Sequence, residues 1–417
     1  MAAVAYEIVL MLIISSSSYI SKSASTCYES IISFGDSLAD TGNSVSLSPT
    51  DKLPLFARPP YGKTFFHHPT GRCSDGRLVI DFIAESLGLP LVQPYFGGEK
   101  AEVDGRRFDK GVNFAVVGAT ALDYEFFEKR GIHNPLTNVS LGTQLDWFKR
   151  FLAKHSGKAY LVFYFLLFYN HFNLYVVAFS FFFFLARDGR KFLQSSLVLV
   201  GGVGGNDYNN PLMQGANEEV IRSFAPRVVN YIGSTIEVRK ELIKLGVETM
   251  LVPGNQPIGC LPIYLAQFKN SSEKDYDSRI GCLNWLNELS KYHNKLLQKE
   301  LSRIRELHPN INIIYADYYN AALRFYLSPN EFGFTKGILR ACCGAEGPYN
   351  FNPAAMCGRL PAVSCDDPSS FASWDGLHST EAAYRLIAQG FLEGPYTTPQ
   401  FRTICPSIPR HPGVYDY

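Results

Sequence analysis

The sequence predicts a three-layer α/β fold, in which helices cover both faces of a parallel sheet. Short, β-branched and nearly continuous apolar runs alternate with longer stretches whose apolar residues recur every three or four positions. A run that is apolar throughout is typical of a strand buried on both faces, as in a parallel sheet. Apolar residues make up 46% of the 417-residue chain, so a large core is expected.

The predicted elements follow one another along the chain. Strands are expected at residues 31–34, 113–117, 197–200, 249–252 and 311–316. Helices are expected at residues 77–87, 141–155, 220–245, 282–307 and 380–392. Right-handed crossovers place the loops that follow parallel strands at one edge of the sheet, where the sites of such sheets collect.

Two segments depart from this pattern. Residues 1–25 hold an apolar run followed by small residues, which predicts a secretory signal peptide before a single domain at residues 26–417. Residues 159–186, the apolar segment, are 28 uncharged residues of which 13 are Phe or Tyr. Three interpretations of this segment compete: a membrane span, a buried hairpin, or sequence foreign to the functional protein.

Charge and cysteine usage narrow the functional class. Lys and Arg total 39 against 38 Asp and Glu, and this net charge of +1 argues against a nucleic-acid partner. Nine cysteines indicate an oxidising compartment, and their odd number leaves at least one thiol without an intramolecular partner. No paired C-x2-C motif is present, so no metal site is expected. The sequons at Asn138 and Asn270 are expected glycan acceptors in a secreted chain.

The catalytic candidates are a serine and an Asp–His pair. Ser37 follows the first predicted strand, where its hydroxyl and its backbone N–H would be exposed at the top of the sheet. Asp375 and His378 are three residues apart, and Gly376 between them permits a tight turn. A carboxylate that holds one imidazole nitrogen leaves the other nitrogen free to take the proton of a serine hydroxyl. Taken singly, each motif also fits ordinary turn and helix-capping residues.

Two glycine-containing turns supply candidate donors for an oxyanion. Gly118 lies in a small-residue turn after a predicted strand, and Asn206 follows the glycine-rich run that begins at Gly201. Such donors stabilise the tetrahedral intermediate of acyl transfer. The glycine-rich run does not fit a dinucleotide fingerprint, because Asp207 occupies the position of the third glycine. The joint occurrence of these residues past strand and helix ends predicts one shared site.

With these motifs, the sequence resembles the plant GDSL esterase/lipase family of the SGNH hydrolases. The resemblance covers nearly the whole chain after residue 26 and includes the stretches 60–66, 70–77, 252–260 and 315–320. It is nearest to the branch with acetyl- and hydroxycinnamoyl-type esterases. The resemblance implies a flavodoxin-like parallel sheet and a secreted, monomeric serine esterase or lipase that acts on small ester substrates and needs no cofactor.

The resemblance also implies a role for each candidate. Ser37 would be the nucleophile, His378 the general base and then acid, and Asp375 the carboxylate that orients it. The backbone N–H groups of Ser37 and Gly118, with the Asn206 side chain, would form the oxyanion hole. Asp36 and Asp207 would be structural. The alternatives are an acyltransferase that uses the same acyl-serine, or an inactive secreted binding protein. The expected location is the apoplast, with the vacuole as an alternative.

The apolar segment conflicts with this function if it crosses a membrane once, because Ser37 and His378 would then lie on opposite sides. Asn170, His171 and Asn173 near its middle would also be costly in hydrocarbon. No stable span is therefore expected. Our hypothesis is that the apolar segment is translated intron retained in the gene, since a pyrimidine-rich tract would encode the run of phenylalanines at residues 181–184. The odd number of cysteines also fits the loss of a cysteine at Gly189, where members of the family often have one.

Overall fold

A six-stranded sheet forms the centre of the fold in the computed structural model, which describes residues 27–97, 108–156, 190–237 and 242–408. Its strand order is β10-β5-β4-β3-β1-β2. The strands are β1 (Ser30–Phe34), β2 (Gly111–Asn113), β3 (Ser196–Val200), β4 (Thr249–Pro253), β5 (Asn312–Ala316) and β10 (Thr397–Thr398). All neighbours pair in parallel except β10, which runs antiparallel to β5. The order 2-1-3-4-5 of the parallel strands is that of flavodoxin-like folds, as predicted.

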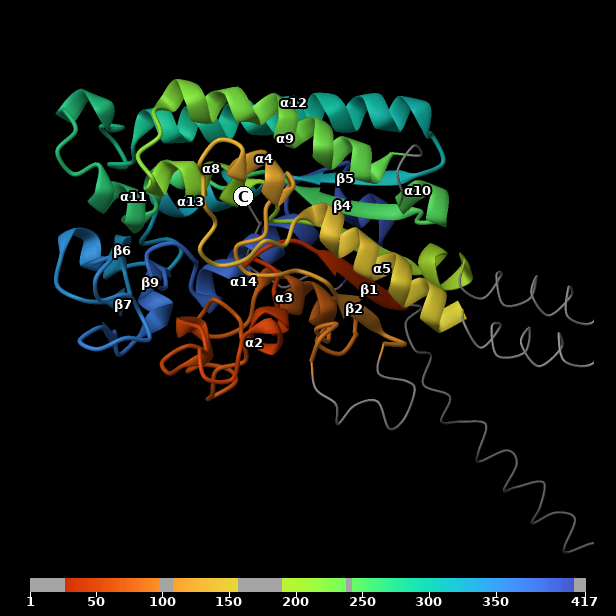
Figure 1. Ribbon diagram of the computed structural model, residues 1–417, viewed down its shortest axis with the longest axis horizontal. Helices are drawn as coiled ribbons and strands as arrows, with labels where there is room; N and C mark the ends of the chain where they lie inside the picture. Colours follow the sequence, from red (N-terminus) through yellow and green to blue (C-terminus); the bar gives the residue numbers. More distant parts are fainter. Residues whose placement is uncertain (1–26, 98–107, 157–189, 238–241, 409–417) are drawn as a thin grey trace, which may run out of the picture.

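Helices cover both faces of this sheet because successive strand residues enter different cores. Ile32 and Val198 belong to one hydrophobic cluster, whereas their neighbours Ile31 and Leu197 belong to the other. The first cluster is covered by α5 (Leu141–Ser156), α8 (Gly205–Met213), α9 (Glu218–Ile236), α10 (Leu242–Leu245) and α12 (Asn284–Leu307). The second is covered by α3 (Val79–Ser86), α13 (Tyr318–Leu327), α14 (Glu381–Leu392) and α15 (Phe401–Ile404). The three predicted layers are therefore present (Figure 1).

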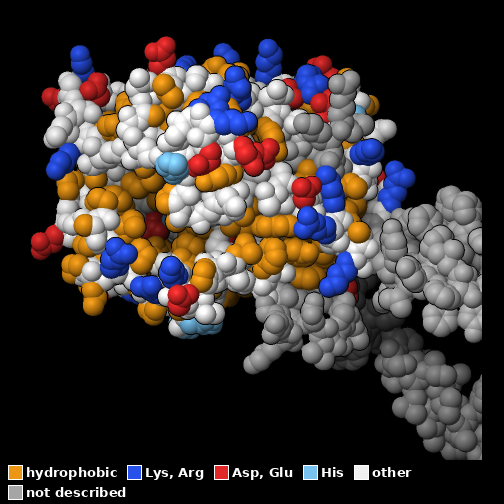
Figure 2. Space-filling view, in the orientation of Figure 1, with side chains coloured by type: hydrophobic (Ala, Val, Ile, Leu, Met, Phe, Trp, Pro, Cys, Tyr) orange, Lys and Arg blue, Asp and Glu red, His pale blue; other side chains and the backbone are white. Residues whose placement is uncertain are grey.

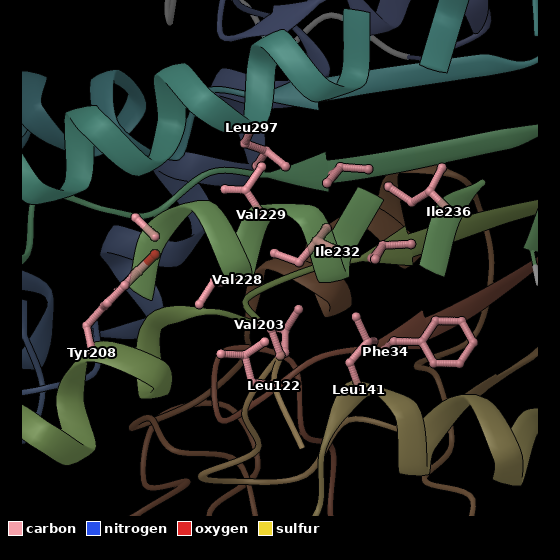
Figure 3. Close-up of a cluster of buried hydrophobic side chains, with 14 of the residues drawn as sticks. Phe34, Leu122, Leu141, Val203, Tyr208, Val228, Val229, Ile232, Ile236 and Leu297 are labelled. Atoms are coloured by element: carbon pink, nitrogen blue, oxygen red, sulfur yellow. The ribbon is translucent and has the colours of Figure 1, made fainter. Parts of the chain in front are cut away.

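The larger cluster connects the sheet to α9 and α12, which lie side by side in Figure 1. Figure 3 shows Val228, Val229 and Ile232 of α9 pointing into this core together with Leu297 of α12. Phe34, the last residue of β1, packs in the same core. The strand that leads to the candidate serine is thus anchored by apolar packing immediately before the loop begins.

Two element predictions need correction. The second strand was predicted at residues 113–117, but β2 ends at Asn113. Beyond it, the N–H groups of Phe114 and Val116 still donate to the Ser33 and Gly35 carbonyls. The alternate N–H groups bond side chains: Ala115 donates to Asn113, and Val117 donates to Asp40. The single helix predicted at residues 220–245 is two helices, because the chain turns extended at Glu237, where α9 ends.

Shorter helices and two small sheets complete the fold. The small helices are α2 (Asn43–Leu47), α4 (Tyr124–Glu128) and α11 (Pro262–Gln267). Two small sheets pair β6 (Gly337–Ala341) with β9 (Phe371–Ser373) and β7 (Cys343–Gly344) with β8 (Val363–Ser364). Disulfides join Cys342 to Cys365 and Cys343 to Cys357 beside these strands.

Eight of the nine cysteines are paired. The other two disulfides are Cys27–Cys405 and Cys260–Cys282, and Cys73 is a buried free thiol. The unpaired cysteine implied by the odd number is therefore Cys73. Position 189 lies outside the described residues.

The predicted signal peptide and the apolar segment also lie outside the described residues. Within the part of the chain that the structure describes, no helix is both long and apolar enough to cross a membrane. Strands from before and after the apolar segment are direct neighbours, since β1 pairs with β3 from Ser30 to Phe34. The parts of the chain before and after the apolar segment therefore belong to one sheet, which a single membrane crossing between them would not allow.

Candidate active site

Ser37, His378 and Asp375 form a continuous chain of hydrogen bonds. The Ser37 hydroxyl lies 2.8 Å from Nε2 of His378, and Nδ1 of the same ring lies 2.8 Å from Oδ2 of Asp375. All three side chains are largely buried. With the carboxylate accepting from Nδ1–H, the Nε2 lone pair faces the serine hydroxyl, which is the arrangement that general-base activation of a nucleophile needs.

The serine is held in place through the backbone of Gly35. A Cβ atom at Gly35 would lie 2.0 Å from the Gly201 carbonyl oxygen, so only glycine fits here. The Gln144 side chain, from α5, makes two bonds to Gly35: its carbonyl oxygen accepts from the N–H at 2.8 Å and its amide donates to the C=O at 2.7 Å. The loop therefore leaves β1 in a path fixed from both sides.

The Asp–His pair comes from a tight turn after β9. Gly376 has a φ of +98°, in the left-handed region that favours glycine. Oδ1 of Asp375 accepts the backbone N–H groups of Leu377 and His378, at 3.0 and 2.8 Å. We predicted that all site loops meet at the edge of the main sheet. His378 does reach Ser37, but β9 is not part of the main sheet, because it pairs with β6 in a separate small sheet.

The candidate oxyanion donors are two backbone N–H groups and one side-chain amide. In the described part of the chain, the backbone N–H groups of Ser37 and Gly118 have no hydrogen-bond acceptor. Gly118 has a φ of +82°, and its carbonyl is held by the Asn134 amide at 2.8 Å. The Asn206 amide donates to the Ala119 carbonyl at 3.0 Å and lies 3.3 Å from a carboxylate oxygen of Asp36. Such N–H groups suit the binding of developing negative charge.

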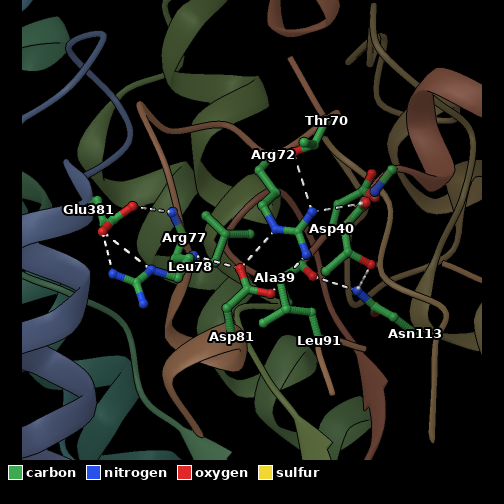
Figure 4. Close-up of polar contacts among 12 residues, drawn as sticks. Ala39, Asp40, Thr70, Arg72, Arg77, Leu78, Asp81, Leu91, Asn113 and Glu381 are labelled. Atoms are coloured by element: carbon green, nitrogen blue, oxygen red, sulfur yellow. Dashed lines mark hydrogen bonds and ion pairs between the residues drawn. The ribbon is translucent and has the colours of Figure 1, made fainter. Parts of the chain in front are cut away.

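Asp40 connects the serine loop with the Gly118 loop. Its Oδ2 accepts from the Ser44 hydroxyl at 2.5 Å and from the backbone N–H of Val117 at 3.0 Å. The Asn113 amide adds a second tie, because it donates to the Ala39 carbonyl (Figure 4). Figure 4 also shows the buried ion pair of Arg72 with Asp81, at 2.8 Å, beside this region. These bonds fix Gly118 relative to Ser37.

The carboxyl groups near His378 differ in pKa. Burial raises the pKa of Asp375, but the charge and hydrogen bonds of His378 outweigh it and hold this pKa below its usual value. Burial lowers the pKa of His378, and the Asp375 carboxylate more than compensates, so the pKa of His378 lies above its usual value. Burial raises the pKa of Asp36 to about 7.

Asp207 has structural contacts, in line with the role that the resemblance implied. Its two carboxylate oxygens accept the backbone N–H groups of Ala121 and Leu122 at 2.8 and 3.0 Å. Burial raises the pKa of Asp207 to about 7. The residue after Asn206 thus ties the start of α8 to the end of the Gly118 loop.

A small cavity of about 40 Å³ adjoins the serine. Its wall includes Ser37, Asn206 and His378, together with Asn255 and Gln256. Gly118 is not part of this wall. The face in Figure 2 carries a hollow rimmed mostly by hydrophobic side chains, on the side where β6 and β9 lie in Figure 1. Across the described residues, no group of three His, Cys, Asp or Glu is arranged to hold a metal ion.

Two supporting residues, Gln144 and Tyr61, were not predicted. Gln144 is fully buried, three residues after Leu141 and one before Leu145, on the apolar side of its helix. A polar residue at such a position is a signal that sequence reasoning could have used. The Tyr61 hydroxyl bonds Asp375, and no local pattern in the sequence indicates this contact.

Comparison with known proteins finds relatives that are all described as esterases or lipases. The family model described as GDSL-like Lipase/Acylhydrolase matches residues 31–391. The chain is 49% identical to GDSL esterase/lipase At1g28600 of Arabidopsis thaliana, over 91% of this chain and 87% of that protein. It is also 49% identical to GDSL esterase/lipase At1g28590 of the same plant, over 91% and 85%. It is 46% identical to sinapine esterase of Brassica napus, over 91% and 88%.

Proposed function

Since the chain belongs to the GDSL-like lipase/acylhydrolase family and is a carboxylic-ester hydrolase, we propose that it acts through an acyl-serine intermediate on Ser37. The observation that supports this most directly is the unbroken chain from the Ser37 hydroxyl through His378 to Asp375, with both links at 2.8 Å. The 46% identity to a sinapine esterase makes small plant esters reasonable first substrates to test.

In the first half-reaction, Oγ of Ser37 attacks the ester carbonyl carbon while Nε2 of His378 takes the hydroxyl proton. The carbonyl π electrons move to oxygen, and the tetrahedral intermediate then expels the alcohol, which takes the proton back from His378. In the second half-reaction, water attacks the acyl-serine and gives a proton to His378. The carboxylic acid leaves, and the proton returns to Oγ of Ser37.

The oxyanion would be bound by the N–H groups of Ser37 and Gly118 and by the Asn206 amide. The two backbone N–H groups have no acceptor among the described residues, so an incoming oxygen replaces no protein bond there. The Asn206 amide has one short bond, to the Ala119 carbonyl, and one longer contact of 3.3 Å with Asp36. In our proposal the oxyanion competes for this longer contact.

We further propose that the protein is a secreted, glycosylated monomer. Four disulfides support an oxidising compartment, since such bonds persist mainly outside the cytosol. Asn138 and Asn270 are both exposed, as glycan acceptors must be. Residues 1–25 would be the signal peptide and 26–417 one domain. Mass spectrometry of secreted protein before and after glycosidase treatment tests the N-terminus and both sequons, and an unprocessed N-terminus would contradict the proposal.

Retained intron remains our proposal for the apolar segment. Sequencing transcripts across codons 158–190 tests it. Mature message that contains the segment in abundance would overturn the idea.

Replacing the serine tests the proposed mechanism. We expect Ser37→Ala to abolish hydrolysis of an aryl acetate, because no other group could form the acyl-enzyme. Ser33→Ala serves as the matched control, since it removes a buried hydroxyl from β1, the strand that leads to Ser37, and this hydroxyl has no hydrogen-bond partner in the described part of the protein. A folded Ser37→Ala variant with wild-type turnover would refute the nucleophile assignment.

A further inference from the structure

The Tyr61 hydroxyl contacts the Asp–His pair from a distant part of the sequence. It donates a hydrogen bond to Oδ2 of Asp375 at 2.9 Å, across a separation of 314 residues. The same oxygen accepts Nδ1–H of His378 at 2.8 Å. Tyr61 is therefore the one side chain, besides His378, that bonds the Asp375 carboxylate in the described residues.

The Asp375 carboxylate has four donors, two on each oxygen. The backbone N–H groups of Leu377 and His378 occupy Oδ1, and Tyr61 and the imidazole occupy Oδ2. The backbone bonds leave rotation of the carboxylate plane partly free, whereas a bond to Oδ2 restrains the oxygen that faces the imidazole. We propose that Tyr61 is a positioning residue that orients the Asp375 carboxylate toward His378 during ester hydrolysis. This inference rests on the proposed function.

Tyr61 is itself rigidly placed. Its side chain is buried, and its ring packs edge-on against Trp374, with ring centroids 5.9 Å apart. The backbone N–H of the next residue, Gly62, donates to the Ser74 carbonyl at 3.0 Å. The Ser74 hydroxyl in turn donates to the Ser379 carbonyl at 3.0 Å, next to His378. The tyrosine loop is thus bonded to the segment that carries the Asp–His pair.

The hydroxyl remains a donor at the pH values at which an esterase works. Burial raises the pKa of Tyr61 well above its usual value, and the neighbouring Asp375 carboxylate raises it further. Tyr61 is not in the wall of the cavity next to Ser37. Loss of its hydroxyl should therefore change the chemical step and leave substrate binding alone.

Other titratable groups also act on the Asp–His pair. Asp36 raises the pKa of His378 through its charge, and the buried groups of Cys73 and Tyr384 lie near Asp375. Burial raises the pKa of Cys73 and of Tyr384 well above their usual values, so both stay neutral. Burial raises the pKa of Asp36 and of Asp207 to about 7, and Asp207 acts on Asp36 through its charge, so both titrate in the working range. The Asp36 carboxylate accepts from Leu38 and Asn206 and not from Tyr61.

The test is Tyr61→Phe in the full-length chain, which keeps the ring and removes the hydroxyl. We expect kcat for an aryl acetate to fall about tenfold with KM unchanged, because the Asp375 carboxylate is then held less firmly in the orientation that aligns His378 with Ser37, and this loss outweighs any gain in basicity. With one donor fewer, the carboxylate stabilises imidazolium more strongly. The acid limb of the kcat/KM profile should therefore move to higher pH, by about half a unit.

Tyr231→Phe is the matched control, because it removes a tyrosine hydroxyl that bonds another carboxylate, Asp123, at 3.1 Å. Rates are normalised to active sites titrated with an aryl phosphonate. The position of the acid limb does not depend on how much protein is folded. A Tyr61→Phe variant whose acid limb stays at the wild-type pH would overturn the inference, even if its kcat fell. Wild-type protein no more active than Ser37→Ala would instead refute the proposed function.

Discussion

Asp36 and Asp375 are two buried carboxyl groups that both act on His378, yet their pKa values shift in opposite directions. Asp375 accepts four hydrogen bonds, one of them from the imidazole, and its pKa is held below the usual value. Asp36 accepts one short bond, from the Leu38 N–H at 2.9 Å, and a longer one from Asn206. Burial raises its pKa to about 7.

The difference shows that burial alone does not decide the charge of a carboxyl group. The number of donors and the presence of a protonatable partner decide it. The turn at Gly376 aims two backbone N–H groups at Asp375, while the path of β1 leaves Asp36 with few donors. One carboxyl group is thus suited to remain ionised beside an imidazolium, and the other is suited to exchange a proton near neutral pH.

The largest effect should come from Asp375→Asn. An amide cannot balance the charge of the imidazolium and can donate to Nδ1, which selects the wrong ring tautomer. We expect kcat to fall by about 10⁴-fold, the size of the effect of this substitution in a Ser-His-Asp triad whose geometry stays intact. Asp36→Asn should lose less than about tenfold, because an amide oxygen can still accept from Leu38. Equal losses in the two variants would show that the two carboxyl groups do not have different roles.

The pH dependence of kcat/KM should show the next largest effect, and it distinguishes the role of Asp36 from that of Asp375. His378 must be neutral to accept the serine proton, so kcat/KM should fall tenfold per unit below its raised pKa. Because Asp36 contributes to that raised pKa, the limb in Asp36→Asn should remain but move to slightly lower pH. The measurement is the profile of both proteins from pH 5 to 9. Disappearance of the limb in Asp36→Asn would assign it to Asp36.

The sequence could predict the features that depend on residues close together in the chain, and it missed those that depend on distant ones. The layers follow from local patterns, because a strand buried on both faces and an amphipathic helix each have a recognisable apolar spacing. The strand order does not follow from such patterns, and only the resemblance to a known family implied it. The Asp375–His378 contact was predictable because both residues lie in one turn. The Tyr61 contact was not, because it joins loops 314 residues apart. The end of β2 was missed because apolar Phe114 to Val117 continue the strand pattern while their N–H groups bond Ser33, Gly35 and buried side chains.

Removing the side chain that supports the serine loop should lower kcat less than changing the Asp375 carboxylate does. Gln144→Ala removes both bonds to Gly35. The backbone N–H and C=O of Gly35 are then buried without these partners. We expect about a tenfold loss of kcat and a lower melting temperature, since each unsatisfied buried group costs about 1–3 kcal/mol. Gln298→Ala is the control, because that side chain bonds the Asn294 carbonyl of its own helix, at 3.3 Å, and Tyr315, and neither bond involves Gly35. Melting curves and turnover of both variants check this, and unchanged values for Gln144→Ala would contradict it.

The smallest effect concerns stability at Asp36. Its pKa is raised on folding from 3.8 to about 7, so between these values the folded protein holds a proton that the unfolded chain has released. Stability contributed by this group therefore falls as pH rises through that window, by at most roughly 4 kcal/mol. Asp36→Asn carries no charge and avoids this cost. Its melting temperature should exceed the wild-type value by a few degrees at pH 8, and the gap should shrink toward pH 4. A gap that is constant with pH would mean that Asp36 is charged in the folded protein throughout, as Asp375 is.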